Sequence, residues 1–207
     1  MRTKQTKKSE LTREKILLAA EAEFAEGGYH GARVDAIAAC AGVNKRMIYA
    51  HFGSKDGLYA EILLAVYSRL AKCERQFMTD DPDPVSAIRS IIKVSFRFLS
   101  ENPNFIRILM WENLNRGMAI PKEELIKLKL PTLIYMREQI EKGKAIGLFR
   151  EDADEYHVIL SMMNFCFSYF SNLHTMSAVL DKDLAGEENV SDRADFICNI
   201  ILGYLKA

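Results

Sequence analysis

Residues 43–59 (VNKRMIYAHFGSKDGLY) gather side chains that can hydrogen bond to nucleic-acid bases and phosphates. Arg46 can pair with both acceptors of a guanine edge, Lys45 offers a positive charge to guanine or phosphate, and Met47 can contact a thymine methyl group. Tyr49, one turn later, is the fourth expected base contact. The segment therefore predicts a helix that reads the edges of DNA bases.

Phosphate contacts position such a helix without reading sequence. The expected phosphate contacts are Arg33, His51, Lys55 and Thr12. Charge supports this end of the chain as the DNA-binding part, since residues 1–56 hold ten Lys and Arg against seven Asp and Glu. The remainder is slightly acidic, and a basic arm over residues 2–8 suits contact with nucleic acid at one end of the protein.

The elements around residues 43–59 have the order of a helix-turn-helix. A helix is expected over residues 34–40, a tight turn at 41–43 (Ala-Gly-Val), and a second helix from Asn44, a good N-cap, to about residue 51. This geometry exposes the N-terminal residues of the second helix to a major groove. The side chains expected to face inward are Val43, Ile48 and Phe52.

The whole chain is predicted to be all-α, with nine helices, because period-2 alternation is nearly absent and Pro and Gly fall at breaks. Thr12 is expected to cap the first helix, which stops at Gly27-Gly28, and Ser54 to cap the fourth, which ends near Met78. Asp80–Pro84 is the clearest linker. The other five helices are expected over residues 85–101, 104–116, 121–146, 153–180 and 191–206. The predicted domains are residues 1–56, which bind DNA, and residues 57–207, a helical body.

Several functional classes lack support in the sequence. The N-terminus has no apolar core of a secretory signal, no apolar run is long enough to span a membrane, and the four cysteines form no CxxC pair. A cytoplasmic, reduced protein is expected. Four histidines lie on separate elements, without HExxH, GxSxG, P-loop or Rossmann glycines, so no enzyme, metal site or cofactor is predicted.

Residues 12–63 resemble the DNA-binding head of the tetracycline-repressor (TetR/AcrR) family of bacterial transcription regulators. The most specific part is IYAHFGSKDGL, at residues 48–58. Beyond the head, the resemblance covers only the helical architecture. It implies a homodimeric regulator, usually a repressor, that binds an operator in double-stranded DNA and is released by a small effector. The other matching residues are Ile16, Ala19, Ala20, Phe24, Gly28, Tyr29, Val34, Ile37, Ala38, Ala41, Gly42 and Val43.

The sequence departs from the family pattern at two places. Arg33 stands where the family usually has a hydroxyl residue, which removes a cap from the next helix and puts a cation beside the expected phosphates. Gly57 replaces an acidic residue at the start of the fourth helix, which weakens the expected capping box.

The last two predicted helices carry wide apolar surfaces, which favours a homodimer over a monomer that buries them internally. The residues expected at the dimer interface are Phe167, Phe170, Ala194, Ile197, Ile201 and Leu205. The residues expected to line an effector pocket combine aromatic surface with polar groups. They are Phe96, Met110, Trp111, Tyr135, Phe165, Tyr169 and His174, although an aromatic residue at helical spacing is more often ordinary core and His174 could equally be a core or dimer-interface histidine.

Two other functions stay open at this stage. A regulator could be switched by oxidation of Cys40, beside the turn, instead of by a ligand; Cys40 could also be a small buried residue. A helical interaction module without sequence-specific DNA binding is the other alternative. The sequence does not identify the operator, the regulated genes or the effector, and does not distinguish repression from activation.

Overall fold

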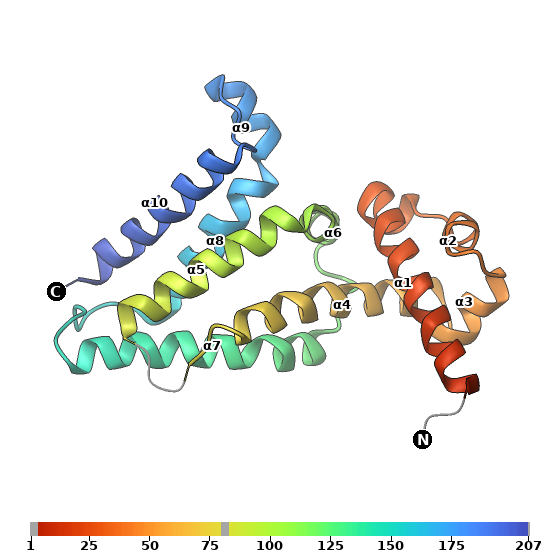
Figure 1. Cartoon of the computed structure of the whole chain (residues 1–207), viewed down its shortest axis with the longest axis horizontal. Coiled ribbons are helices and arrows are strands. Elements are labelled where there is room, and N and C mark those ends of the chain that lie inside the picture. Colours follow the sequence, from red (N-terminus) through yellow and green to blue (C-terminus); the bar gives the residue numbers. More distant parts are fainter. Residues whose placement is uncertain (1–3, 80–82, 207) are drawn as a thin grey trace. The chain divides into compact units, whose positions relative to one another are not determined.

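A computed structural model describes residues 4–79 and 83–206, with side chains from residue 8 onwards. Within these residues the chain forms ten helices and no strand, which confirms the predicted all-α fold (Figure 1). None of the described helices combines the length and apolarity needed to cross a membrane. The helices are α1 (Lys4–Gly31), α2 (Val34–Ala41), α3 (Lys45–Phe52), α4 (Lys55–Arg75), α5 (Pro84–Glu101), α6 (Pro103–Leu114), α7 (Lys122–Ala145), α8 (Glu155–Ser171), α9 (Leu173–Leu180) and α10 (Glu187–Leu205).

The predicted count of nine helices was one too low for the described residues, because the segment expected as one helix over 153–180 is two. Asn172 separates α8 from α9 with φ −108° and ψ 10°. Its side-chain amide donates to the carbonyl of Ser168 at 2.9 Å. Asn competes in this way with the backbone hydrogen bonds of a helix, so the helix ends there and α9 begins at Leu173.

The first helix begins earlier than predicted. It begins at Lys4, and Thr12 lies inside it, where the hydroxyl donates to the carbonyl of Lys8 at 2.9 Å and caps nothing. The backbone of the predicted basic arm is therefore helical from Lys4, whereas Arg2 lies outside the described residues. At the other end the regular helix breaks at Gly28, as predicted: φ is 63° and ψ is −172° there, and a short helical stretch continues to Gly31.

The chain divides into two compact units. The head unit contains the residues up to Tyr67 together with Arg107–Leu125, and the body unit contains Ser68–Ile106 and the residues from Ile126 onwards. The division into residues 1–56 and 57–207 stays a prediction.

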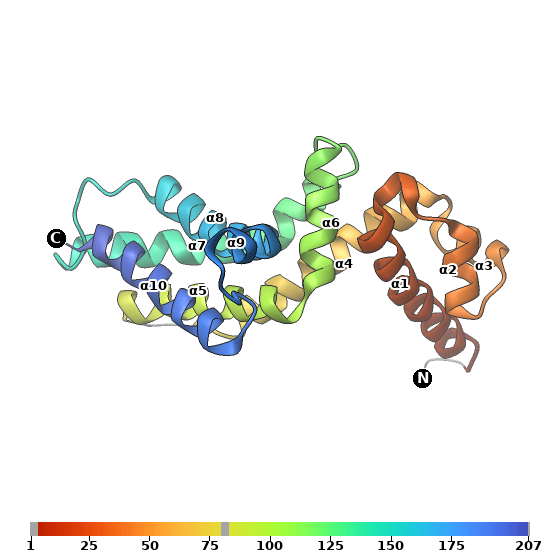
Figure 2. The ribbon, with the colours of Figure 1, turned by 90° about the horizontal axis from the view of Figure 1, so that it is seen from above.

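Helices α1 to α4 of the head unit pack around a small apolar core. Helix α2 lies against α1 and α3, and α1 and α2 can be followed side by side in the view from above (Figure 2). Within α1 to α4 of the head unit, the residues with no exposed surface are Ile16, Ala20, Phe24, Ile37, Ile48, Leu58, Tyr59, Ile62 and Val66. This core packs only against the inner face of α3, and that face holds the helix in place.

In the body unit α5, α8 and α10 pack against one another. Asp83 caps α5 by accepting from the N–H of Ser86 at 2.9 Å, and Pro84 occupies the first turn, where a missing N–H is tolerated. The C-terminus of α10 is joined to the loop after α7, since the N–H of Arg150 donates to the carbonyl of Leu205 at 2.8 Å. Phe149, in the same loop, is buried.

Gly143 in α7 allows Phe149 to reach this position. A Cβ at residue 143 would lie 2.1 Å from Cδ2 of Phe149, so the ring and the helix must move apart in Gly143→Ala. We expect this variant to lower the free energy of unfolding by about 1–3 kcal/mol in urea denaturation. Gly203→Ala is the matched control, because α10 leaves open space there. It should be neutral or stabilising by up to about 1 kcal/mol, and equal losses in both variants would contradict the explanation.

Candidate nucleic-acid interface

The local sequence explains how α3 is held with one face outward. Gly42 adopts the left-handed conformation at φ 64° and ends α2, and Asn44 caps α3 by accepting from the N–H of Arg46 at 2.9 Å. Ile48 is fully buried and Phe52 is 9% exposed, so they anchor the inner face as predicted. Val43, the third expected anchor, is half-buried.

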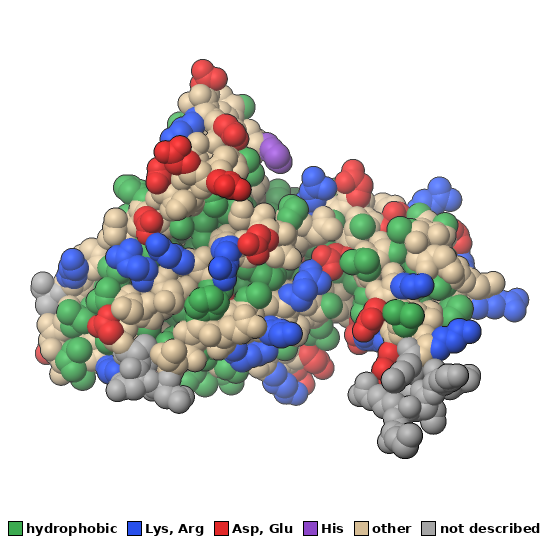
Figure 3. Space-filling view, viewed as in Figure 1, with side chains coloured by type: hydrophobic (Ala, Val, Ile, Leu, Met, Phe, Trp, Pro, Cys, Tyr) green, Lys and Arg blue, Asp and Glu red, His purple; other side chains and the backbone are tan. Residues whose placement is uncertain are grey.

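The four expected base contacts all lie on exposed surface of α3, from which basic side chains project in Figure 3. Arg46 is exposed, and Met47 and Tyr49 keep 39% and 42% of their surface. Lys45 instead pairs with Asp35 of α2, with Nζ 2.9 Å from the carboxylate. That hydrogen bond raises the pKa of Lys45. To contact a base or a phosphate, Lys45 would have to give up its pair with Asp35, whereas the side chain of Arg46 is already exposed.

The expected phosphate contacts have different surroundings. Arg33 is exposed just before α2, and its backbone N–H, not its guanidinium, donates to the Glu23 carboxylate at 3.0 Å. His51 is half-buried. Lys55 donates to the carbonyl of Ala32 at 2.6 Å, and its ammonium lies 4.8 Å from the centre of the Tyr29 ring. Arg33 is therefore the best placed of these cations, and Lys55 would have to share its ammonium with a phosphate. Thr12 is half-buried in the interior of α1.

The start of α4 shows why glycine occupies position 57. Ser54 caps the helix as predicted, since its hydroxyl accepts from the N–H of Gly57 at 3.0 Å. A Cβ at residue 57 would lie 2.2 Å from the carbonyl oxygen of Phe52. Glycine at position 57 therefore allows the first turn of α4 to pack closely against the carbonyl end of α3. The sequence alone did not predict this close contact.

Side-chain contacts that the sequence did not predict join the parts of the head unit. Arg13 of α1 pairs with Glu61 of α4, and its guanidinium lies 5.3 Å from the centre of the Phe52 ring. The hydroxyl of Tyr29 donates to Asp56, which raises the pKa of Tyr29. The two residues of each of these pairs lie far apart in the sequence, so no local sequence pattern predicts the contacts.

The residues expected to line an effector pocket fall in both units. Met110 and Trp111 belong to the head unit, where the indole N–H of Trp111 donates to the carbonyl of Ala25 at 3.3 Å. The kinked Gly28 makes room for this indole, because a Cβ there would lie 2.7 Å from Cδ2 of Trp111. The other five belong to the body unit: Phe96 and Tyr135 are buried, Phe165 and Tyr169 are half-buried, and His174 is exposed on α9.

Most of the residues expected at a dimer interface are buried within their own chain. Ile197 and Leu205 have no exposed surface, and Ile201 keeps 4%. Ala194 and Phe170 are also buried, and Phe167 is half-buried. The apolar face of α10 that contains Ala194, Ile197, Ile201 and Leu205 packs against α5 and α8. Its fully buried residues therefore cannot contact a second copy of the chain. The exposed apolar residues of α10 are Phe196, Ile200 and Tyr204.

The four cysteines are free, and their exposure predicts their reactivity. Cys40 is exposed, contrary to the alternative that it is a small buried residue, whereas Cys166 and Cys198 are buried. Burial raises the pKa of the Cys166 thiol to about 12 and also raises that of Cys198. A thiol reagent at neutral pH should therefore modify Cys40 in the folded protein and reach Cys166 and Cys198 only after unfolding. Peptide mapping measures this order, and an unreactive Cys40 would exclude it as a redox switch.

Comparison with known proteins identifies the fold and the family. The family described as "Bacterial regulatory proteins, tetR family" matches residues 16–62, and "Tetracyclin repressor-like, C-terminal domain" matches residues 84–201. The HTH-type transcriptional repressor NicS of Pseudomonas putida is 34% identical over 211 residues, covering 100% of both chains.

Two further proteins agree with this assignment. The HTH-type transcriptional repressor SCO4008 of Streptomyces coelicolor is 38% identical over 115 residues, or 55% of this chain and 56% of that one. The crystal structure of a TetR family transcription regulator from Marinobacter aquaeolei has the same fold, with a TM-score of 0.75 at 15% identity over 97% of this chain and 98% of that chain. With the exposed basic helix of a helix-turn-helix head, these matches show that the chain is a DNA-binding transcription regulator of the TetR family.

Proposed function

We propose that the protein is a homodimeric repressor that binds a palindromic operator through α3 and is released by a small-molecule effector. The observation that carries the proposal is the exposed row of Arg46, Met47 and Tyr49 on a helix anchored by Ile48 and Phe52. A helix presented this way fits a major groove. The similarity to NicS, which is named a repressor, favours repression over activation.

Two-fold symmetry requires a surface that matches a copy of itself. In the body unit, Phe196, Ile200 and Tyr204 keep 55%, 40% and 48% of their surface and follow one another at four-residue spacing on α10. Leu160 and Met163 keep 39% and 48% of their surface on α8, but they line a groove with Leu130 and Ile134 of α7 and are not part of this row. A row of exposed apolar side chains on one helix favours burial against a second subunit.

We therefore expect Phe196→Glu with Ile200→Glu to shift the protein from dimer to monomer in sedimentation experiments. Both glutamates would have to lose their hydration in the interface. Ile146→Glu is the matched control, since Ile146 is 62% exposed and follows α7. A double variant that stays dimeric would exclude this surface as the interface.

Polar groups in the body unit support an effector site there. The Tyr135 hydroxyl and the Gln139 side-chain oxygen, one turn apart on α7, are buried and have no hydrogen-bond partner within the described residues. Buried polar atoms are usually satisfied, so a bound molecule is a reasonable partner for them. The Phe96 and Tyr169 rings, 5.2 Å apart, supply aromatic surface in the same unit.

A hydroxyl-radical footprint on the DNA upstream of the protein's own gene tests the proposal. We expect two protected half-sites related by a dyad, with their centres about one helical turn of DNA or a multiple of it apart. Affinity should fall steeply with salt, because phosphate contacts release counterions. Uniform protection of every DNA fragment would contradict sequence-specific binding.

A further inference from the structure

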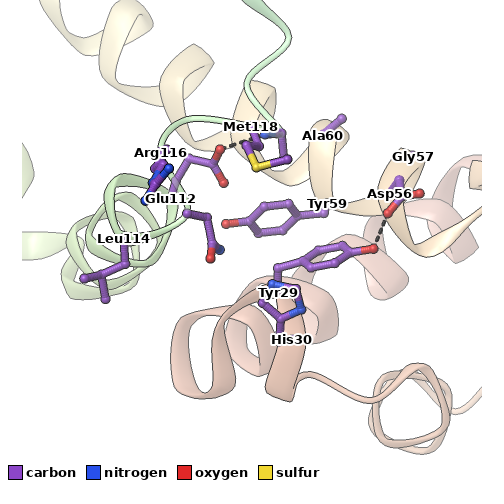
Figure 4. A pocket seen from close by; sticks show the side chains of 12 residues that line it. Tyr29, His30, Asp56, Gly57, Tyr59, Ala60, Glu112, Leu114, Arg116 and Met118 are labelled. Atoms are coloured by element: carbon purple, nitrogen blue, oxygen red, sulfur yellow. Dashed lines mark hydrogen bonds between the residues drawn. The ribbon is translucent and has the colours of Figure 1, made fainter.

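The head unit contains a cavity that neither operator binding nor the effector residues of the body unit use. Its volume is about 730 Å³, and its lining comes from the end of α1, the start of α4, and α6 with the loop that follows it (Figure 4). Tyr29, Tyr59, Leu114 and Met118 supply apolar surface. A cavity of this size can hold a small organic molecule.

Two buried polar side chains face one another at this cavity (Figure 4). Glu112 is 2% exposed; its Oε1 accepts from the N–H of Ala119 at 2.8 Å, and its Oε2 is also buried. Tyr59 is fully buried, its hydroxyl points towards Glu112, and burial together with the Glu112 carboxylate raises the pKa of that hydroxyl. One neutral hydroxyl is a weak partner for a buried carboxylate, so the site favours a ligand that supplies a charged N–H.

The surrounding charges favour a cation over an anion. Asp56 and Glu112 contribute two carboxylates to the lining, against the single guanidinium of Arg116, which is exposed, and the imidazole of His30. The Tyr29 and Tyr59 rings lie 5.4 Å apart and offer aromatic surface to a cationic or apolar group. Met118, beside Glu112 in Figure 4, is 86% exposed and unbranched, so it can move aside to admit a ligand.

We propose that this cavity binds a small organic cation, an ammonium group on an apolar body, with the ammonium between Glu112 Oε2 and the Tyr59 hydroxyl. The apolar body lies against Tyr29, Leu114 and Met118. The site is distinct from any effector site in the body unit and does not depend on operator binding. Asp56, Gly57 and Tyr59 lie in the first turns of α4, directly after α3, so the ligand contacts the segment that carries the recognition helix.

Tryptophan fluorescence tests this binding without DNA. Trp111 is the only tryptophan in the sequence, and it precedes Glu112 directly. The probe is 2-phenylethylammonium, compared with neutral 2-phenylethanol and anionic 3-phenylpropanoate. We expect saturable binding of the ammonium, binding of the alcohol that is weaker by about 10-fold or more, and no binding of the anion.

Two variants locate the site. Glu112→Gln keeps the oxygen that accepts from Ala119 but loses the charge, so the ammonium and the alcohol should then bind alike. Tyr59→Phe should weaken the ammonium by about 3-fold or more, because it removes a hydroxyl that contacts the ammonium. Glu124→Gln, exposed on α7, is the matched control and should bind as the wild type does.

Three results would overturn the proposal. They are no saturable binding of the ammonium, equal binding of the alcohol to the wild type, and an unchanged preference for the ammonium in Glu112→Gln. If Glu112→Gln does not fold, wild-type affinity in Tyr59→Phe would overturn it instead.

Discussion

Arg46→Ala is expected to weaken operator binding by the dimer by about 30-fold or more. A bidentate contact between arginine and guanine contributes about 1–3 kcal/mol, and a dimer loses it in both half-sites. Arg46 is exposed, and its backbone N–H, not its side chain, donates to the Asn44 cap of α3. The change should therefore leave the folded head intact, which a thermal melt can confirm.

Electrophoretic mobility shift or fluorescence anisotropy at fixed salt measures the effect. Arg75→Ala is the matched control, because Arg75 is exposed in the last turn of α4 and belongs to the body unit. It removes the same charge and should change affinity by less than about 2-fold. Equal losses in both variants would show that Arg46 acts through net charge alone.

Lys129→Met is expected to lower the free energy of unfolding by about 3–5 kcal/mol, because it leaves a buried carboxylate without its countercharge. Glu74 is 4% exposed in the body unit and pairs with Lys129 of α7, whose side chain is 13% exposed. Thr132 also donates to Glu74, at 2.8 Å, and Ser95 donates at 3.5 Å. Two neutral hydroxyls do not replace an ammonium in such a site.

Urea denaturation of two further variants separates burial from simple loss of an ion pair. Lys93→Met breaks an exposed pair with Asp195, at 2.7 Å with both side chains nearly half-exposed, and should cost less than about 1 kcal/mol. Adding Glu74→Gln to Lys129→Met should restore most of the lost stability, since an amide needs no countercharge. If Lys129→Met costs no more than Lys93→Met, the pair is not effectively buried.

Local signals in the sequence predicted the head well. The limits of α3 follow from Gly42, which permits a left-handed turn, and Asn44, which caps the next helix. Ile48 and Phe52 then fix which face is buried, so the exposed positions of Arg46, Met47 and Tyr49 could be predicted. The break at Asn172 was missed, because the apolar pattern of residues 153–180 continues through it.

The body was harder to predict, because an apolar stripe does not reveal what covers it. On α10 the spacing found Ile197, Ile201 and Leu205, but α5 and α8 cover them within the same chain. The exposed Phe196 and Ile200 lie on the other side of the helix. Glu112 illustrates the same limit: an acid on a helix is normally solvated, and only the fold shows that this one is buried.

The central claim, that α3 reads operator bases through Arg46, is tested most directly by a double-mutant cycle between protein and DNA. The affinities of wild type and Arg46→Ala are measured for the footprinted operator and for versions in which each guanine of a half-site is replaced. We predict one guanine whose replacement costs the wild type about 1–3 kcal/mol and costs Arg46→Ala almost nothing. If every replacement costs both proteins the same, Arg46 does not read a base and the proposed role of α3 is wrong.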